Sequence, residues 1–197
     1  ESGSPEGRQL TRDRVPVGNH EVAAAGTAGR REAGPLEEEE DRVRAVLQRA
    51  GSGRVKVLDR VVGEIGRGLV VLLGVADGDG EREAVWTARK LAELRIFEDD
   101  EGRMNRSVED VGGDVLLVSQ FTLLADCRKG RRPSFVSAAA PEEGERLYER
   151  VAALLEERGL RVEKCVFGAR MLVEIANEGP VTIVLDSPVT SGKEVGG

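Results

Sequence analysis

Short runs of aliphatic and β-branched residues, each about as long as one strand, dominate the chain from Val43 onward. Residues 69–73 form one such run and residues 115–118 another. Runs without polar alternation are typical of strands that are buried on both faces of a sheet. The patterns predict strands at residues 43–49, 55–57, 61–65, 69–73, 94–97, 114–119, 162–167, 171–176 and 181–185.

Two amphipathic stretches predict helices at residues 81–94 and 141–158. Each has four aliphatic residues at helical spacing: Val85, Ala88, Leu91 and Ala92 in the first, and Leu147, Val151, Leu154 and Leu155 in the second. Pro141 suits a first helical turn, and Gly159 suits a C-terminal stop. This order of elements predicts a single α/β domain in which the helices pack on one face of mixed β-sheets.

The first 42 residues differ in composition from the rest of the chain. They are rich in Gly, Ala, Pro, Arg and Glu, and they end in an acidic block at residues 37–41. A charged segment without apolar periodicity cannot form a core. We therefore expect a disordered low-complexity leader at residues 1–42, a folded domain at residues 43–186 and a flexible tail at residues 187–197.

Charge and composition exclude several classes of protein. The leader holds ten of the 36 acidic residues and six of the 29 Lys and Arg residues, so the folded part has a net charge of only −3. Such a surface has no general attraction for nucleic acid, so any contact with RNA must rely on a local patch. The sequence contains no run of about 18 apolar residues, so it predicts no membrane span. It also contains no apolar signal core, so it does not indicate export. We expect a cytoplasmic protein that binds neither DNA nor a membrane.

Cysteine and histidine usage limits the chemistry further. Cys127 and Cys165 lack the spacing of a metal site or a disulfide framework, and we expect both to be reduced packing residues. The only histidine, His20, lies in the expected leader. The folded domain therefore has no histidine base or ligand, and we expect neither a metal nor another cofactor.

The first candidate site follows the expected strand at residues 114–119. Ser119, Gln120, Phe121 and Thr122 come at or just after its end, where side chains are held rigidly and remain open to solvent. Thr122 could be a nucleophile or a hydrogen-bond donor, and a nucleophilic hydroxyl needs a base. From the residues alone, a structural role is favoured.

A basic loop follows this segment. It contains Arg128, Lys129, Arg131 and Arg132. A charge run is usually a solvated face, but its position beside the candidate site makes phosphate binding an equal alternative.

The second candidate site is the pair Gly179-Pro180 between two strand-like runs. Pro180 has no amide proton, so it interrupts a ladder and exposes carbonyl groups. The residues alone favour a turn. The alternative is a rigid pair of carbonyls presented to a ligand.

Several segments together resemble the D-aminoacyl-tRNA deacylase family. They are residues 48–49, 63–65, 72–75, 95–97, 104–105, 119–123, 132–135 and 177–182. Glu178 departs from the Asp that is common in this family, and Val43 stands where these chains usually begin with Met. The leader has no family counterpart, which indicates an extension or a start site placed too far upstream.

The resemblance implies a homodimeric hydrolase with a three-layer fold that splits D-aminoacyl-tRNA into a D-amino acid and tRNA. It also implies activity on glycyl-tRNA mischarged on alanine tRNA. In this family a cis Gly-Pro pair of one subunit enters the active site of the other, so Gly179 and Pro180 are expected to face residues 119–122 of the second subunit. Arg49 matches the arginine that holds the pair. Ser134 and Phe135 match a segment that borders the pocket.

The expected selection works by exclusion, because rigid carbonyls clash with an L side chain. An aminoacyl ester is already activated, and the neighbouring ribose hydroxyl can assist its hydrolysis. Main-chain amides near Phe121 and Thr122 would then stabilise the developing charge. Thr122 as a nucleophile is the alternative mechanism.

A tRNA-binding module without catalysis is the alternative function. In that case the basic loop grips phosphate, and Phe121 or Phe135 stacks on a base. The near-neutral folded domain and an aromatic content of only 3% argue against it.

Overall fold

The computed structural model describes residues 42–188. Its strands are β1 (Arg44–Val57), β2 (Arg60–Ile65), β3 (Gly68–Gly74), β4 (Phe97–Glu98), β5 (Met104–Arg106), β6 (Asp114–Ser119), β7 (Val162–Lys164) and β8 (Leu172–Asp186). Its helices are α1 (Glu81–Glu93), the 3-10 helix η1 (Phe121–Leu124) and α2 (Pro141–Glu157). No helix among the described residues is long and apolar enough to cross a membrane.

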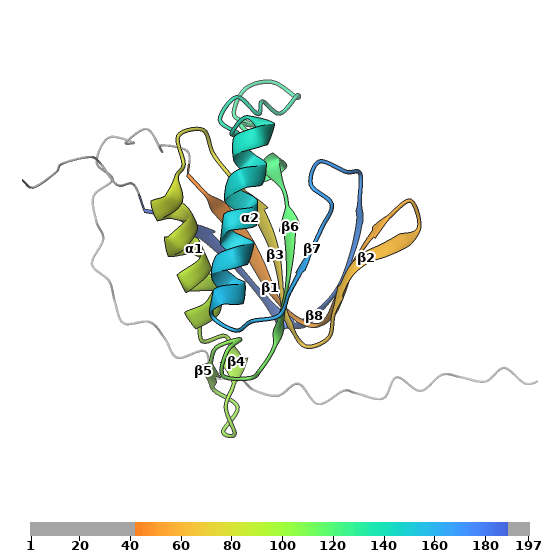
Figure 1. The fold of residues 1–197 in the computed structure, drawn as a ribbon, viewed down its shortest axis with the longest axis vertical. Helices are drawn as coiled ribbons and strands as arrows, with labels where there is room; N and C mark the ends of the chain where they lie inside the picture. The colour runs from red at the N-terminus through yellow and green to blue at the C-terminus, as the bar shows by residue number, and fades with distance from the viewer. Residues whose placement is uncertain (1–41, 189–197) are drawn as a thin grey trace, which may run out of the picture. The chain divides into compact units, whose positions relative to one another are not determined.

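A six-stranded mixed sheet forms the centre of this domain (Figure 1). Five strands follow the order β2-β1-β3-β6-β7, and β8 pairs antiparallel with β1 along most of its length. β3 and β6 pair in parallel, with Leu73 opposite Ser119. β4 and β5 form a separate two-stranded sheet. The parallel pair β3–β6 lies inside the sheet, so both faces of these strands must be covered.

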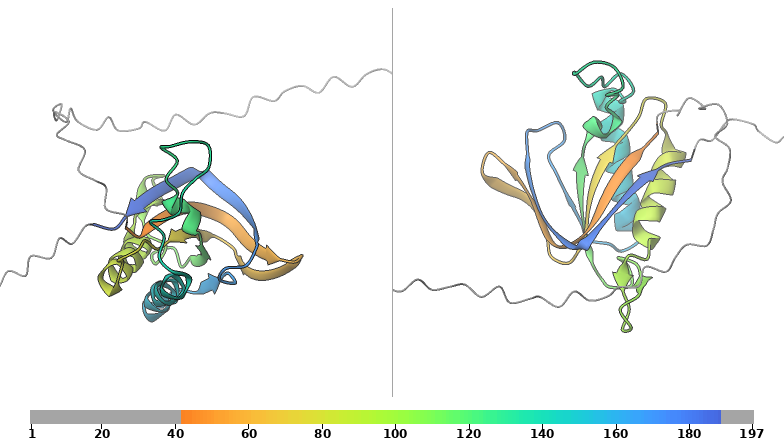
Figure 2. Two further views of the ribbon diagram at one scale, coloured as in Figure 1. Left: turned by 90° about the horizontal axis from the view of Figure 1, so that it is seen from above. Right: turned by 180° about the vertical axis from the view of Figure 1, so that it is seen from behind.

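The two faces of the central strands pack into separate apolar clusters. On one face, Leu47, Leu73 and Leu117 pack with residues of α1 and α2, including Leu91 and Val151. Figure 2 shows both helices on this side of the sheet. The opposite face carries a second cluster, whose members include Val55, Ile65, Val70, Leu116 and Val118. Layers on both faces of β3 and β6 explain why their sequences are continuously apolar.

The fold confirms the expected α/β domain, its helices on one face and the strands at residues 69–73 and 114–119. Several details differ. Of the strand expected at residues 94–97 only Phe97 lies in a strand, β4, and the strands expected at residues 171–176 and 181–185 merge into β8. Residues 43–49 and 55–57 belong to one long strand, β1, because β8 pairs with it throughout. The short β5 and the helix η1 were not expected, and β7 ends three residues early.

The expected leader and tail lie almost entirely outside the described residues. Arg42, Ser187 and Pro188 are the exceptions at the two borders. The Ser187 side chain is buried, its N–H donates to the Val43 carbonyl oxygen at 3.0 Å, and Arg42 Nη1 donates to its carbonyl at 3.3 Å. The described domain thus includes Ser187, which the sequence assigned to the tail.

Candidate functional site

The first candidate segment leaves the sheet at the end of β6. The Gln120 N–H donates to the Leu73 carbonyl oxygen at 2.7 Å, which fixes the chain to β3 just before η1 begins. The Gln120 side-chain amide donates to Thr122 Oγ1. Ser119 and Gln120 are half-buried, whereas Phe121 and Thr122 are exposed. The sheet therefore anchors one end of a segment whose other end faces solvent.

A main-chain pair closes the basic loop and brings its far end back to η1. Asp126 and Ser134 exchange two hydrogen bonds, of 2.8 and 2.9 Å. Phe135 follows, and its ring contacts the Phe121 ring edge-to-face, with centroids 5.1 Å apart and planes 70° apart. Ser134 and Phe135 thus lie close to η1 in the fold, and the pocket border that the resemblance implied for them stays a prediction.

The four cations of the basic loop differ in their surroundings. Arg128 is bound to Asp126 through Nε and Nη2, at 2.9 and 3.0 Å. These bonds, with one from the Arg128 N–H, lower the pKa of Asp126 to about 2. Lys129, Arg131 and Arg132 are exposed and form no ion pair within residues 42–188. Three of the four predicted phosphate ligands are therefore available to a partner.

The expected turn at Gly179-Pro180 is wrong, because both residues lie within the continuous strand β8. Their peptide bond is cis. Asn177 pairs with Ala50 and Thr182 with Gln48, so four residues of β8 bulge opposite one residue of β1. Pro180, which has no N–H to donate, sits in this bulge. The expectation that Pro180 interrupts the ladder is confirmed, although the strand continues beyond it.

Side chains hold the bulge from both sides. The Val181 N–H donates to Asn177 Oδ1 at 2.9 Å. Arg49, which is only 5% exposed, donates from Nε to the Glu178 carbonyl oxygen at 3.1 Å. The resemblance implied that Arg49 holds the Gly-Pro pair, and the hydrogen bond in this structure is to the residue directly before the pair. Gly179 and Pro180 themselves are exposed.

Arg49 is fixed by further contacts that the sequence did not reveal. Its Nη1 donates to the Ile96 carbonyl oxygen at 2.8 Å, and its Nη2 lies 3.5 Å from Glu98 Oε1. The chain that enters β4 therefore supports the arginine that supports the bulge. In the sequence around Ile96, only the change from apolar to acidic residues at positions 96–98 stands out. It does not indicate that Arg49, 47 positions earlier, binds there.

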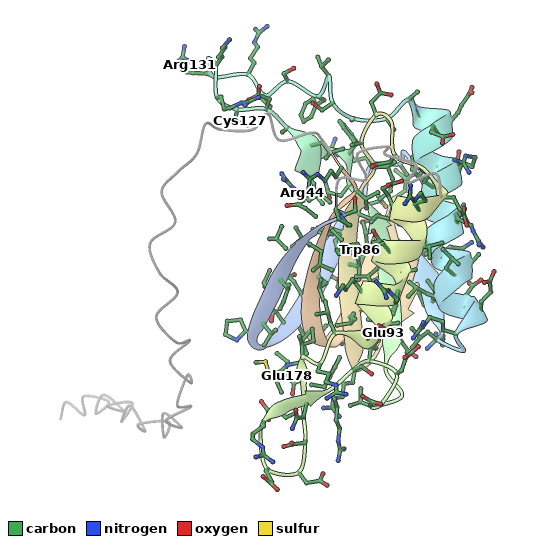
Figure 3. All side chains as sticks on the ribbon, turned by 90° about the vertical axis from the view of Figure 1, so that its left-hand side faces the viewer. Arg44, Trp86, Glu93, Cys127, Arg131 and Glu178 are labelled. Carbon is green, nitrogen blue, oxygen red and sulfur yellow. The ribbon has the colours of Figure 1, made fainter. Side chains whose placement is uncertain are left out.

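The two candidate segments lie at different levels of one sheet. Ser119 pairs with Leu73, and Leu73 pairs with Ala45, whereas the bulge lies beside Arg49. Along β1, Ala45 beside the strand exit and Arg49 beside the bulge are four residues apart, which in extended chain is about 13 Å. Figure 3 shows Cys127 and Arg131, in the loop that follows η1, at one end of the domain and Glu178 far from them. Within one chain, Gly179 and Pro180 do not join residues 119–122.

No group of three or more His, Cys, Asp or Glu residues among residues 42–188 could hold a metal ion. The polar atoms at the strand exit are instead hydroxyl, amide and main-chain groups. Such groups position a substrate and donate hydrogen bonds to developing negative charge.

Comparisons with known proteins find relatives of the described domain. A D-aminoacyl-tRNA deacylase of Heliobacterium modesticaldum is 58% identical over 144 residues, which cover 73% of this chain and 96% of that protein. A solved structure described as a c-Myc DNA unwinding element binding protein has a TM-score of 0.70 and 39% identity, and the match covers 74% of this chain and 99% of that one. A structure of a probable eukaryotic D-amino acid tRNA deacylase has a TM-score of 0.64 and 25% identity, over 73% and 98% of the two chains.

A family model agrees with these relatives. The model described as D-Tyr-tRNA(Tyr) deacylase matches residues 46–186, from the first strand of the sheet to the last residue of β8. This range contains the strand exit, the basic loop and the Gly-Pro bulge. With the family model and relatives of this identity matching over nearly the whole described domain, the chain belongs to the D-Tyr-tRNA(Tyr) deacylase family.

Proposed function

We propose that this protein hydrolyses the ester bond of D-aminoacyl-tRNA and releases a free D-amino acid and tRNA. The observation that carries the proposal is the match to a D-aminoacyl-tRNA deacylase over 96% of that protein's length. The geometry supports it, because one strand exit presents hydroxyl and amide groups without a histidine base. Since the substrate is a product of tRNA charging, we place the activity in the cytoplasm.

The chemistry requires little from side chains. Water attacks the ester carbonyl carbon, the bond to the ribose oxygen breaks, and that oxygen leaves with a proton as the free hydroxyl of tRNA. The neighbouring ribose hydroxyl assists this proton transfer. The first amides of η1, at Phe121 and Thr122, have no acceptor within the helix, and they stabilise the charge that develops on the carbonyl oxygen. Thr122, bonded to the Gln120 side chain, positions the ester. Thr122 as a nucleophile is the competing mechanism.

We further propose that the active site is completed by a second copy of the chain. The support is the separation of about 13 Å between the bulge and the strand exit along β1. A twofold arrangement allows each bulge to meet the other chain's exit. Val184 of β8, 59% exposed, lies opposite Val46, which lies opposite the half-buried Leu72 of β3. These cross-strand neighbours share one open face of the sheet, and they supply apolar area for such an interface.

In this arrangement the Gly179-Pro180 pair selects the substrate. Its carbonyls occupy the space that an L side chain would need, whereas a D side chain points elsewhere. Glycine has no side chain to exclude, so glycyl-tRNA mischarged on alanine tRNA is a second proposed substrate. The buried Arg49 keeps the selecting segment in place through Glu178.

The basic loop is proposed to bind tRNA phosphates. Lys129, Arg131 and Arg132 are exposed and form no ion pair among the described residues. They lie in the same loop that returns to η1 through the Asp126–Ser134 pair. A tRNA whose phosphates are bound there can place its 3′ end near Phe121 and Phe135. The rings of these two residues can stack on a base.

The test is turnover of tRNA(Tyr) charged with labelled D-tyrosine or L-tyrosine. The proposal expects many turnovers per enzyme with the D ester and very few with the L ester. Retention of tRNA without release of labelled amino acid would instead favour the non-catalytic tRNA-binding module. Competition by duplex DNA of equal charge, measured in the same assay, checks whether nucleic acid binding is specific for tRNA.

A further inference from the structure

At Ser119, the ladder of main-chain hydrogen bonds that joins β6 to β7 ends, and the bond there is to a side chain. Along β6, the Val115 N–H donates to the Arg161 carbonyl oxygen at 2.9 Å, and the Leu117 carbonyl oxygen accepts from the Cys165 N–H at 3.2 Å. In a regular parallel ladder the next N–H, that of Ser119, would donate to a main-chain carbonyl of β7. It donates instead to Cys165 Sγ at 3.3 Å.

A buried tyrosine of α2 accounts for this change. The Tyr148 side chain is 1% exposed, and its hydroxyl donates to the Leu117 carbonyl oxygen at 2.8 Å. The same hydroxyl accepts from the Cys165 N–H at 3.1 Å and lies 3.4 Å from Cys165 Sγ. It occupies the end of the ladder, where β7 stops at Lys164. Burial raises the pKa of Tyr148 well above its usual range, so the hydroxyl remains a proton donor.

The chain at the strand exit is therefore held differently on its two sides. Towards β3 it is held by the main-chain bond from Gln120 to Leu73. Towards β7, the Ser119 main chain is held by a thiol, whose sulfur also lies 3.8 Å from Ser119 Oγ. We propose that Cys165, held in turn by Tyr148, is a positioning residue for the active site. By fixing Ser119, it orients the amides of Phe121 and Thr122 that follow.

This inference rests on the proposed function, since it concerns the rate of the same reaction. Loss of one hydrogen bond of about 0.5–1.5 kcal/mol from the support of a catalytic segment lowers a rate about two- to tenfold. Cys165→Ala is therefore expected to lower kcat by about that factor for D-tyrosyl-tRNA, with KM within twofold of the wild-type value. Cys165→Ser, whose hydroxyl can accept from Ser119, should restore most of kcat.

Two further variants separate positioning from general destabilisation. Tyr148→Phe keeps the ring and removes the hydroxyl, and it should lower kcat as Cys165→Ala does. Val162→Ala truncates a half-buried side chain of β7, the strand just before Cys165, at a position that has no bond to Ser119. It should lower the melting temperature but leave kcat unchanged. Amide hydrogen exchange gives a readout besides activity: the Ser119 N–H should exchange faster in Cys165→Ala than in Val162→Ala.

The outcomes are distinguishable. A wild-type protein that does not hydrolyse D-tyrosyl-tRNA refutes the proposed function and the positioning role with it. An active wild type with unchanged kcat in Cys165→Ala and Tyr148→Phe refutes the positioning role alone. An equal fall of kcat in Val162→Ala also refutes it, because the effect would then follow stability. A selective fall of kcat with faster Ser119 exchange supports the proposal.

Discussion

Adding one methyl group at Gly179 tests whether the bulge of β8 selects the substrate. Gly179 has φ of 127°, and a Cβ there would lie 2.9 Å from Val181 Cγ2 and 3.0 Å from Arg49 Nη2. A non-glycine residue in such a conformation costs about 1–3 kcal/mol. We therefore expect Gly179→Ala to lower the free energy of unfolding by about that amount, before any cost of the close contacts.

The contacts decide which part of the structure moves. The Arg49 guanidinium cannot retreat without losing its bonds to the Ile96 and Glu178 carbonyl oxygens, at 2.8 and 3.1 Å. Gly179 and Pro180 are exposed whereas Arg49 is buried, so the segment at Gly179 and Pro180 is the part that shifts. Its carbonyls would then leave the position that excludes an L side chain, and the ratio of D to L deacylation rates should fall.

The assay measures both rates with tRNA(Tyr) charged with each enantiomer of tyrosine, together with a urea unfolding curve. Gly102→Ala is the matched control, because Gly102 also has positive φ, 75°, but a Cβ there meets nothing within 4 Å. The control should lose stability and keep the D to L ratio. An unchanged ratio in a folded, dimeric Gly179→Ala protein would refute selection by this segment.

Three further changes test other parts of the site. Replacing Lys129, Arg131 and Arg132 together by Ala should weaken tRNA binding and lower the slope of log affinity against log salt by about two to three, measured by filter binding at several salt concentrations; an unchanged slope would make the loop a solvated face. Thr122→Ala should retain a measurable deacylation rate, whereas an acyl-enzyme detected by mass spectrometry in the wild type would establish the nucleophile mechanism. The pKa of Asp126 is lowered from 3.8 to about 2, so its pairing stabilises the fold fully above about pH 4 and is lost as the pH falls through 2. Asp126→Asn should therefore make the melting temperature depend less on pH between 2 and 4, and equal curves would contradict the pairing.

Elements with a strong local pattern were predictable from the sequence. The continuous apolar run at residues 115–118 placed β6, and the helical spacing of apolar residues placed α1 and α2 within one residue at each end. In these segments propensity, pattern and burial agree. The exit of β6 could be located for the same reason, since the run ends in Ser119 and Gln120.

The path of β8 was not predictable, because distant side chains replace its missing main-chain bonds. Glycine and proline together indicate a turn when only near neighbours are considered. In the fold, Arg49 donates a hydrogen bond to the Glu178 carbonyl oxygen, and the Asn177 side chain accepts one from the Val181 N–H. The strand can therefore continue past Pro180. The first of these contacts joins residues 129 positions apart. Cys165 packs against both apolar clusters, as expected, whereas Cys127 is exposed and the packing role expected for it is wrong. Nothing near Cys165 in the sequence indicates its contact with Ser119.

Selection by exclusion is limited by how firmly the excluding segment is held. A bulky L side chain can bind if the segment moves aside, and the cost of that movement sets the largest discrimination that a clash can give. Moving Glu178 to Pro180 away from Arg49 breaks one hydrogen bond from a charged donor, whereas moving Arg49 with them keeps that bond and breaks the one to Ile96 instead. Either movement costs about 1.5–3 kcal/mol, or roughly 10- to 150-fold in rate. The buried arginine, and not the proline ring alone, therefore limits how strongly this chain can distinguish the two enantiomers.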